Sequence, residues 1–148
     1  MINIPLVQTS DRNINQLQQN VKQKVEEMFM EESGTFNANL SGFADAVSIQ
    51  LKWQTGTVQN AVTIFLPDFT APSVSTDLSI SGLPTNLYPD TNQFVFARVV
   101  DSGVRYIGLA EITTNGQIGF AKDINGNVFT SSGTKGILSL TFTYLRGV

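Results

Sequence analysis

The chain has 148 residues, of which 14% are charged and 41% hydrophobic, and its formal net charge is −3 at pH 7. This length suits one ordinary domain, and the scarcity of Lys and Arg argues against a nucleic-acid partner, because such binding needs clustered cations. Cysteine and histidine are absent, which excludes thiol nucleophiles, Cys- or His-ligated metals and Ser–His–Asp triads. The sequence contains no apolar run of about 18 residues, so no membrane insertion is predicted.

The first nine residues are expected to form an extended segment that precedes any regular structure. They lack the basic region and the long apolar run of a secretory signal. Their apolar part consists of Ile4, Pro5, Leu6 and Val7.

Residues 10–33 are predicted to form a helical stem. Ser10 is a suitable N-cap, no Gly or Pro interrupts the segment up to Glu32, and Ser33-Gly34 provides a stop. The apolar residues recur every three or four positions and form a narrow stripe, named here the stem seam: Ile14, Leu17, Val21, Val25 and Met28. A narrow stripe is typical of a coiled coil. The alternative, an amphipathic helix packed on its own domain, usually shows a wider apolar face, and it remains open.

Residues 34–148 are predicted to form an antiparallel β-sandwich or jelly-roll knob, so the chain as a whole is expected to be mainly β. The apolar period changes to two, as in Val47, Ile49, Leu51 and Trp53. Many short strands with Gly-containing turns between them favour this architecture. The expected strands are 36–40, 47–53, 58–66, 76–81, 93–101, 104–112, 117–121 and 137–146, with a short further piece at 127–130.

One hairpin can be predicted to the residue. The two-residue turn Ser102-Gly103 pairs Asp101 with Val104 and, further along, Val99 with Tyr106. Both faces of this hairpin are largely apolar, whereas one face of a solvated antiparallel sheet should be polar. A neighbouring copy is the natural cover for the second face, and the alternative is cover by a long loop of the same chain, 67–77 or 82–92.

The sequence offers few candidates for chemistry, and the chain is expected not to be an enzyme. The acidic residues of the knob are sparse and do not pair at strand or helix spacing. Asp123-Ile124-Asn125-Gly126-Asn127 partly matches a calcium loop, but its spacing fits an Asn-Gly turn better, and 131–136 lacks the phosphate-loop pattern. No catalytic, cofactor or metal site is predicted. Among the aromatic residues, Tyr88 in the 82–92 loop is the one expected to be exposed and is a candidate ligand contact.

Two stretches make the sequence resemble virion proteins of tailed bacteriophages. Residues 5–12, Pro-Leu-Val-Gln-Thr-Ser-Asp-Arg, followed by Ile14 and Leu17-Gln18, resemble the start of short fibre and decoration proteins. The knob resembles the β-rich ends of phage fibres and spikes at 34–42, 62–67, 81–84 and 131–137.

The resemblance implies a homotrimer with no cofactor, built as a trimeric coiled-coil stem that carries a jelly-roll knob. It implies attachment to phage capsid or tail proteins through Ile4, Pro5, Leu6 and Val7, assembly in the host cytoplasm and a place on the virion surface. Because the stem is short, we expect a capsid decoration, cement or head-fibre subunit. The alternative is a short tail fibre or receptor-binding knob used in host adsorption, with a host surface glycan as a further partner.

Overall fold

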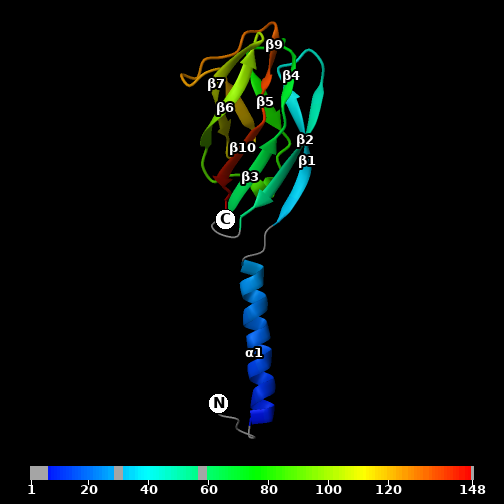
Figure 1. Ribbon diagram of the computed structural model, residues 1–148, viewed down its shortest axis with the longest axis vertical. Coiled ribbons are helices and arrows are strands. Elements are labelled where there is room, and N and C mark those ends of the chain that lie inside the picture. The colour runs from blue at the N-terminus through cyan, green and yellow to red at the C-terminus, as the bar shows by residue number, and fades with distance from the viewer. Residues whose placement is uncertain (1–6, 29–31, 57–59, 148) are drawn as a thin grey trace. The chain divides into compact units, whose positions relative to one another are not determined.

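The computed structural model describes residues 7–28, 32–56 and 60–147 (Figure 1). The chain divides into two compact units, Met1–Glu31 and Glu32–Val148. The first contains the helix α1 (Val7–Met28), and the second, called the β domain below, contains all the strands. Among the described residues, no helix is long and apolar enough to cross a membrane.

Helix α1 begins three residues before the predicted start, so Ser10 lies inside the helix and is not its N-cap. Its 22 residues contain neither Gly nor Pro, the two residues that most disfavour a helix interior, so no residue of this segment interrupts the helix. Residues 29–31 of the predicted stem lie outside the described residues. Ser33 and Gly34 do not end the helix but open strand β1, where a Cβ on Gly34 would lie 2.9 Å from Nε1 of Trp53.

The β domain consists of ten strands and one short 3₁₀ turn, η1 (Thr85–Leu87). The strands are β1 (Ser33–Ser41), β2 (Val47–Thr55), β3 (Ala61–Leu66), β4 (Phe69–Pro72), β5 (Leu78–Ser81), β6 (Gln93–Asp101), β7 (Val104–Ile112), β8 (Ile118–Ala121), β9 (Thr134–Ile137) and β10 (Leu140–Leu145).

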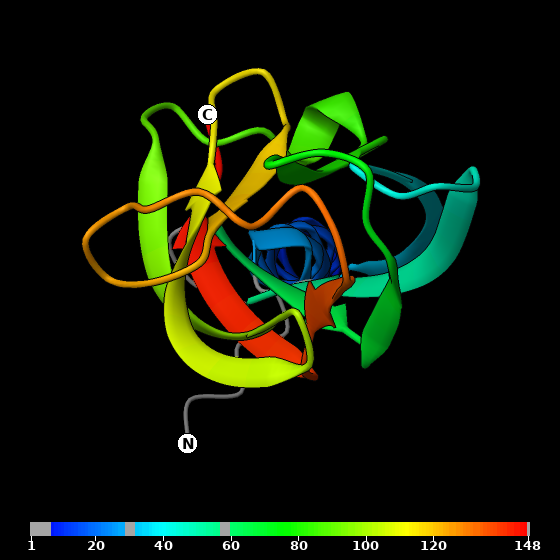
Figure 2. The same cartoon turned by 90° about the horizontal axis from the view of Figure 1, so that it is seen from above.

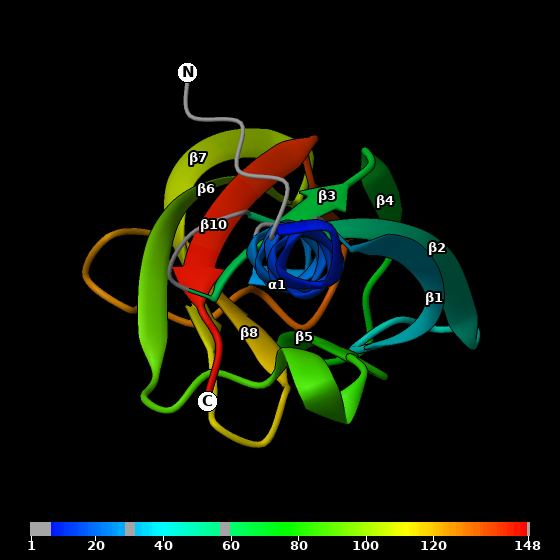
Figure 3. The same ribbon diagram turned by 90° about the horizontal axis from the view of Figure 1, so that it is seen from below.

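All ten strands belong to one hydrogen-bonded sheet in the order β10-β3-β2-β1-β5-β8-β7-β6-β9-β4, and every pairing is antiparallel. Seen end-on, the strands curl around one interior (Figures 2 and 3). The curl brings the two ends of the sheet back to other strands. The amide of Leu138, just before β10, donates to Arg98 of β6, and that of Ala44, after β1, donates to Pro72 of β4. Exposed sheet edges, which favour aggregation, are thereby reduced.

The predicted fold class is confirmed: the chain is mainly β, with an N-terminal helix and an antiparallel β domain. The β6–β7 hairpin has the predicted bounds and register, with Asp101 opposite Val104 and Val99 opposite Tyr106. Ser102 and Gly103 both have positive φ, 51° and 79°, as a type I′ turn requires. Turn chemistry alone was therefore sufficient to define this hairpin.

Three details of the strand prediction were wrong. Segment 137–146 is two strands, because the chain leaves β4 and β6 after β9 and then pairs with β3 in β10. The 67–77 segment is not only loop but contains β4, with Pro67 two residues before the strand and Pro72 as its last residue. Proline is confined to edges and ends of strands, so the sequence gives little sign of a strand here. Residues 127–130 form no strand, because the amide of Thr130 donates to the Asp101 carboxylate instead of a ladder carbonyl.

The interior is a continuous apolar cluster drawn from strands throughout the sheet, with Leu51, Ile64, Ile80 and Ile112 almost completely buried. Burying apolar surface in this way is the main stabilising contribution to such a domain.

Lys135 is also completely buried, in β9. Segment 131–136, which lacks the phosphate-loop pattern, thus ends in a strand of the sheet. The Lys135 ammonium donates to the backbone carbonyls of Ser75 and Asp77 and lies 5.6 Å from the ring centre of Phe129. Burial lowers the pKa of Lys135, as expected when an ammonium group loses water.

Asp101, at the end of β6, is the buried anion of the domain's described part, with 2% of its surface exposed. Its carboxylate accepts from the hydroxyl and amide of Thr130, and Nζ of Lys122 lies 3.0 Å away. Burial by itself would raise the pKa of Asp101, but the hydrogen bonds from Thr130 and Lys122 outweigh it, so this pKa is lowered. Asp101 therefore holds the 122–130 loop onto the sheet.

Asp101→Asn is expected to lower the free energy of unfolding at pH 7 by about 1–3 kcal/mol, because it removes a charged acceptor from buried donors. A carboxylate with a lowered folded pKa stabilises the protein above its unfolded pKa, near 4, and this stabilisation disappears as the pH falls through the folded pKa. The difference between wild type and variant in urea unfolding should therefore shrink from pH 7 to about pH 3. Asp45→Asn, in the exposed turn after β1, is the control, and an unchanged difference at low pH would contradict the assignment.

Candidate functional site

The stem seam lies exposed along α1. Ile14, Leu17, Val21 and Val25 are 47%, 62%, 53% and 44% exposed, respectively. Met28 is the last residue of α1, and its side chain lies outside the described residues. Elsewhere on the helix polar side chains bond to one another, as in Gln16 to Asn20 at 3.0 Å. A coiled coil buries a stripe of large apolar side chains of this kind between its helices. The trimeric stem stays a prediction, and the four described side chains of the stem seam are exposed as it requires.

The predicted attachment segment is mostly outside the described residues. Ile4, Pro5 and Leu6 fall there, whereas Val7 is the first residue of α1. Residues 7–9, which were expected to be extended, belong to the helix, and the expectation for residues 1–6 stays a prediction.

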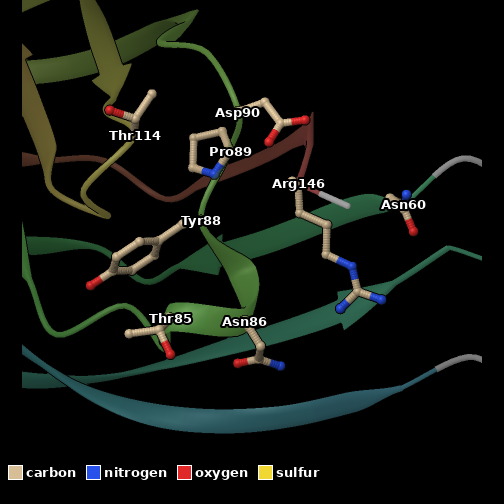
Figure 4. Close-up of a pocket in the computed structure, with 9 residues that line it drawn as sticks. Asn60, Thr85, Asn86, Tyr88, Pro89, Asp90, Thr114 and Arg146 are labelled. Carbon is tan, nitrogen blue, oxygen red and sulfur yellow. The ribbon is translucent and has the colours of Figure 1, made fainter.

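Tyr88, the predicted ligand contact, lines a cleft of about 650 Å³ in the β domain. Polar and apolar atoms line the cleft in similar amounts. Its walls come from the residue before β3, the η1 turn and the residues after it, the loop after β7 and the residues after β10 (Figure 4). The lining residues are Asn60, Thr85, Asn86, Tyr88, Pro89, Asp90, Thr114, Arg146 and Gly147. In Figure 4, Tyr88 and Thr114 lie towards one end of the cleft and Arg146 and Asn60 towards the other.

The η1 turn sets the position of Tyr88. The amide of Tyr88 donates to the carbonyl of Thr85 at 3.3 Å, and Leu87 is buried beneath the turn. The hydroxyl of Tyr144 in β10 donates to the carbonyl of Leu87 at 2.8 Å, and burial raises the pKa of that hydroxyl, so it stays a donor. The amide of Gly147 then donates to the carbonyl of Tyr88. The 82–92 loop is thus tied to the end of β10.

Two glycines allow the cleft walls to approach each other. A Cβ on Gly116, which has φ +78°, would lie 2.0 Å from the Tyr88 ring, and one on Gly147 would lie 2.5 Å from Oδ1 of Asp90. A side chain at either position would displace a cleft residue. Gly116 is therefore needed for two reasons: its positive φ allows the turn after β7, and its lack of a side chain leaves room for the Tyr88 ring.

The cleft carries charges of both signs. Arg146 lies in the wall, where its Nη1 is 3.9 Å from a carboxylate oxygen of Glu32, and Asp90 is an exposed carboxylate on the same rim. Amide and hydroxyl groups from Asn60, Asn86 and Thr85 supply neutral donors and acceptors. A half-buried aromatic ring among such groups can contact a ligand that has both an apolar face and several hydroxyls, such as a sugar.

Sequence reasoning named Tyr88 as a candidate contact, which stays a prediction, but it named none of the other residues that line the cleft. Asn60, Thr114 and Arg146 are far from it along the chain and meet it only through the pairing of β10 with β3 and the turn after β7. The bridge between Pro89 and Arg146 closes this contact. The glycines at 116 and 147, which leave room for Tyr88 and Asp90, were the available signal in the sequence.

The calcium-like segment forms a turn. The Asp123 carboxylate accepts from the side-chain amide of Asn127 and from the backbone amides of Asn127 and Asn125, and these hydrogen bonds lower the pKa of Asp123. Both of its oxygens thus have donors within the turn. The described part of the chain contains no group of three or more Asp or Glu residues placed to hold a metal ion.

No protein-family model matches the sequence, and no curated protein matches it either. In fold, the chain is similar to the attachment protein sigma1 of a reovirus, whose crystal structure was determined in complex with α-2,3-sialyllactose. The TM-score is 0.50 and the sequence identity 15%, and the match covers 82% of this chain and 69% of the reovirus chain. At this identity the likeness is one of fold alone, and the resemblance to viral fibre knobs that is expected from the sequence is supported to that extent. Its narrower form, tailed bacteriophages, stays a prediction.

Proposed function

We propose that this chain is a non-enzymatic structural protein of the virion surface, a homotrimer in which α1 forms the stem and the β domain is displayed. The observation that carries the proposal is the stem seam, because four exposed apolar side chains at coiled-coil spacing require burial by other helices. The fold of a viral attachment protein supports a place at the virion surface. The resemblance of residues 5–12 and of the knob to phage proteins favours a bacteriophage as the virus, and the short stem favours a decoration, cement or head-fibre subunit.

Wild-type protein is expected to sediment as a trimer of about 48 kDa, three times the 16.1 kDa of the chain. Leu17→Asp/Val21→Asp should reduce it to monomer, because charges in an apolar seam oppose helix association. The matched control is Gln19→Asp/Gln23→Asp, which has the same spacing and charge on the opposite side of the helix and should stay trimeric. A 16 kDa wild-type species at micromolar concentration in analytical ultracentrifugation would refute the stem.

Docking through the N-terminus is the second part of the proposal, with Ile4, Pro5, Leu6 and Val7 as contacts to phage capsid or tail proteins. Deleting residues 2–6 leaves α1 and the β domain complete, so the protein should still be folded and trimeric but absent from purified virions. Incorporation is measured by adding tagged protein to virions that lack it. Incorporation at the wild-type level would show that this segment does not dock.

A second candidate function, adsorption to a host surface glycan, is favoured by the cleft around Tyr88. The cleft combines an aromatic ring with amide, hydroxyl and charged groups, and the reovirus protein of similar fold was determined with a bound oligosaccharide. The same displayed knob could serve both functions, as a short tail fibre or as a receptor-binding decoration.

Wild-type protein on an array of bacterial surface glycans is expected to bind a subset of them. Tyr88→Ala should weaken this binding by about tenfold or more, because losing an aromatic anchor typically costs over 1 kcal/mol. Asn86→Ala, on the exposed rim of the cleft, should weaken it less, and Asn37→Ala on the outer face of β1 should leave it unchanged. The absence of binding to every glycan, or full binding by Tyr88→Ala, would exclude this cleft as the receptor site.

A further inference from the structure

The outer face of the β6–β7 hairpin is apolar and uncovered. On the inner face, Ala97 and Ala110 are buried in the core. On the outer face, Phe94 and Phe96 of β6 are 63% and 70% exposed, and Ile107 of β7 is 57% exposed. Neither the 67–77 nor the 82–92 loop buries these side chains, so the cover expected from the same chain is absent over this part of the described structure.

The outer faces of β1 and β2, in contrast, are polar. The outward residues of β1 are Thr35, Asn37 and Asn39, and those of β2 include Gln50 and Lys52, all with polar side chains directed away from the core. Such alternation is ordinary for an antiparallel sheet with one wet face. The outer faces of β1 and β2 thus differ from that of the β6–β7 hairpin, where three large apolar side chains are exposed.

A hollow lies beside the exposed phenylalanines. It measures about 280 Å³ and is lined by Phe94 of β6, Leu109 and Glu111 of β7, three residues of β8 and Gly126 of the loop that follows. The three residues of β8 are Gly119, Phe120 and Ala121. In the ladder, Leu109 stands between Phe96 on one side and Ala121 on the other. A Cβ on Gly119 would meet nothing within 4 Å, so the space above β8 is open. One surface therefore carries a protruding aromatic ridge, Phe94 and Phe96, and next to it a recess whose lining is apolar except for Glu111.

We propose that this face is the interface between β domains of neighbouring copies, with the Phe94–Phe96 ridge of one copy seated in the Leu109–Gly119–Ala121 hollow of the next. Phe94 also borders the hollow of its own chain, but the ridge of one copy meets the floor of the hollow on another, formed by Leu109, Gly119 and Ala121. The contact is therefore heterologous, and a heterologous contact that closes makes a ring. The small residues Gly119 and Ala121 let an aromatic side chain approach the sheet.

We infer that a second copy of this chain covers the face, because the chain carries another exposed apolar surface, the stem seam. This inference rests on the proposed trimeric stem, which would hold identical β domains together at high effective concentration. The charges around the face fit a subunit contact: Arg98 and Arg105 lie towards one end and Glu111 towards the other, so that an apolar centre has a polar rim.

The chain contains no cysteine, which allows a direct test by disulfide trapping in the full-length protein. Phe96→Cys/Ala121→Cys places one thiol on the ridge and one in the hollow. Within one chain these positions are two strands apart, about 10 Å at the usual strand spacing, which is beyond the reach of about 7 Å between disulfide-linked Cα atoms. Under mild oxidation most chains should therefore run as covalent trimer on a non-reducing gel.

The control pair is Ser48→Cys/Ser81→Cys, which flanks Asn39 on β2 and β5 with the same two-strand separation and should give at least tenfold less covalent trimer. If wild type is trimeric in ultracentrifugation and the Phe96/Ala121 pair stays uncrosslinked, the interface is refuted while the stem stands. If the wild-type protein is monomeric in ultracentrifugation, the proposed trimeric stem is refuted, and the interface proposal that rests on it is refuted as well. Efficient dimer formation by Phe96→Cys alone would mean a two-fold contact and would also overturn the ridge-in-hollow arrangement.

Discussion

The buried ammonium group of Lys135 ties together the segments on which the closed form of the β domain depends. The backbone of Lys135 lies opposite Ala71 in β4 and Asp101 in β6, while its side chain reaches the carbonyls of Ser75 and Asp77 just before β5. An ammonium group deprived of water is costly unless it has acceptors. Any arrangement that separates β9 from the 73–77 segment would leave that charge buried without partners, so this contact favours one packing of the domain over its alternatives.

The same region contains the buried carboxylate of Asp101, which holds Thr130 and Lys122. The long 122–133 connection therefore has charged and hydrogen-bonded anchors although it forms no strand. Gly126 of this loop lines the recess next to Phe94, so the loop that Asp101 anchors in the interior also forms part of the recess wall on the outer face.

The three candidate surfaces of the molecule differ in how they are built. The stem seam is a local feature, since residues at i, i+3, i+4 and i+7 of a helix always share a face. The ridge and hollow need three neighbouring strands in register. The Tyr88 cleft needs the most, because its residues come from four segments that meet where β10 pairs with β3. Together they suit a displayed domain that contacts its own copies on one surface and leaves another available for a ligand.

The sequence by itself was sufficient for the helix, the mainly β fold class and the β6–β7 hairpin, because each depends on short-range periodicity or on a turn whose residues tolerate positive φ. It also identified Tyr88 and both apolar faces of the hairpin. Tertiary structure alone decided that Lys135 is buried, that Pro72 ends an edge strand and that segment 137–146 divides between two partners. These features depend on which strands become neighbours, and pairing between segments far apart in the chain is set by the whole core and not by local pattern. For the same reason Asn60 and Arg146 could be placed beside Tyr88 only after the sheet had closed.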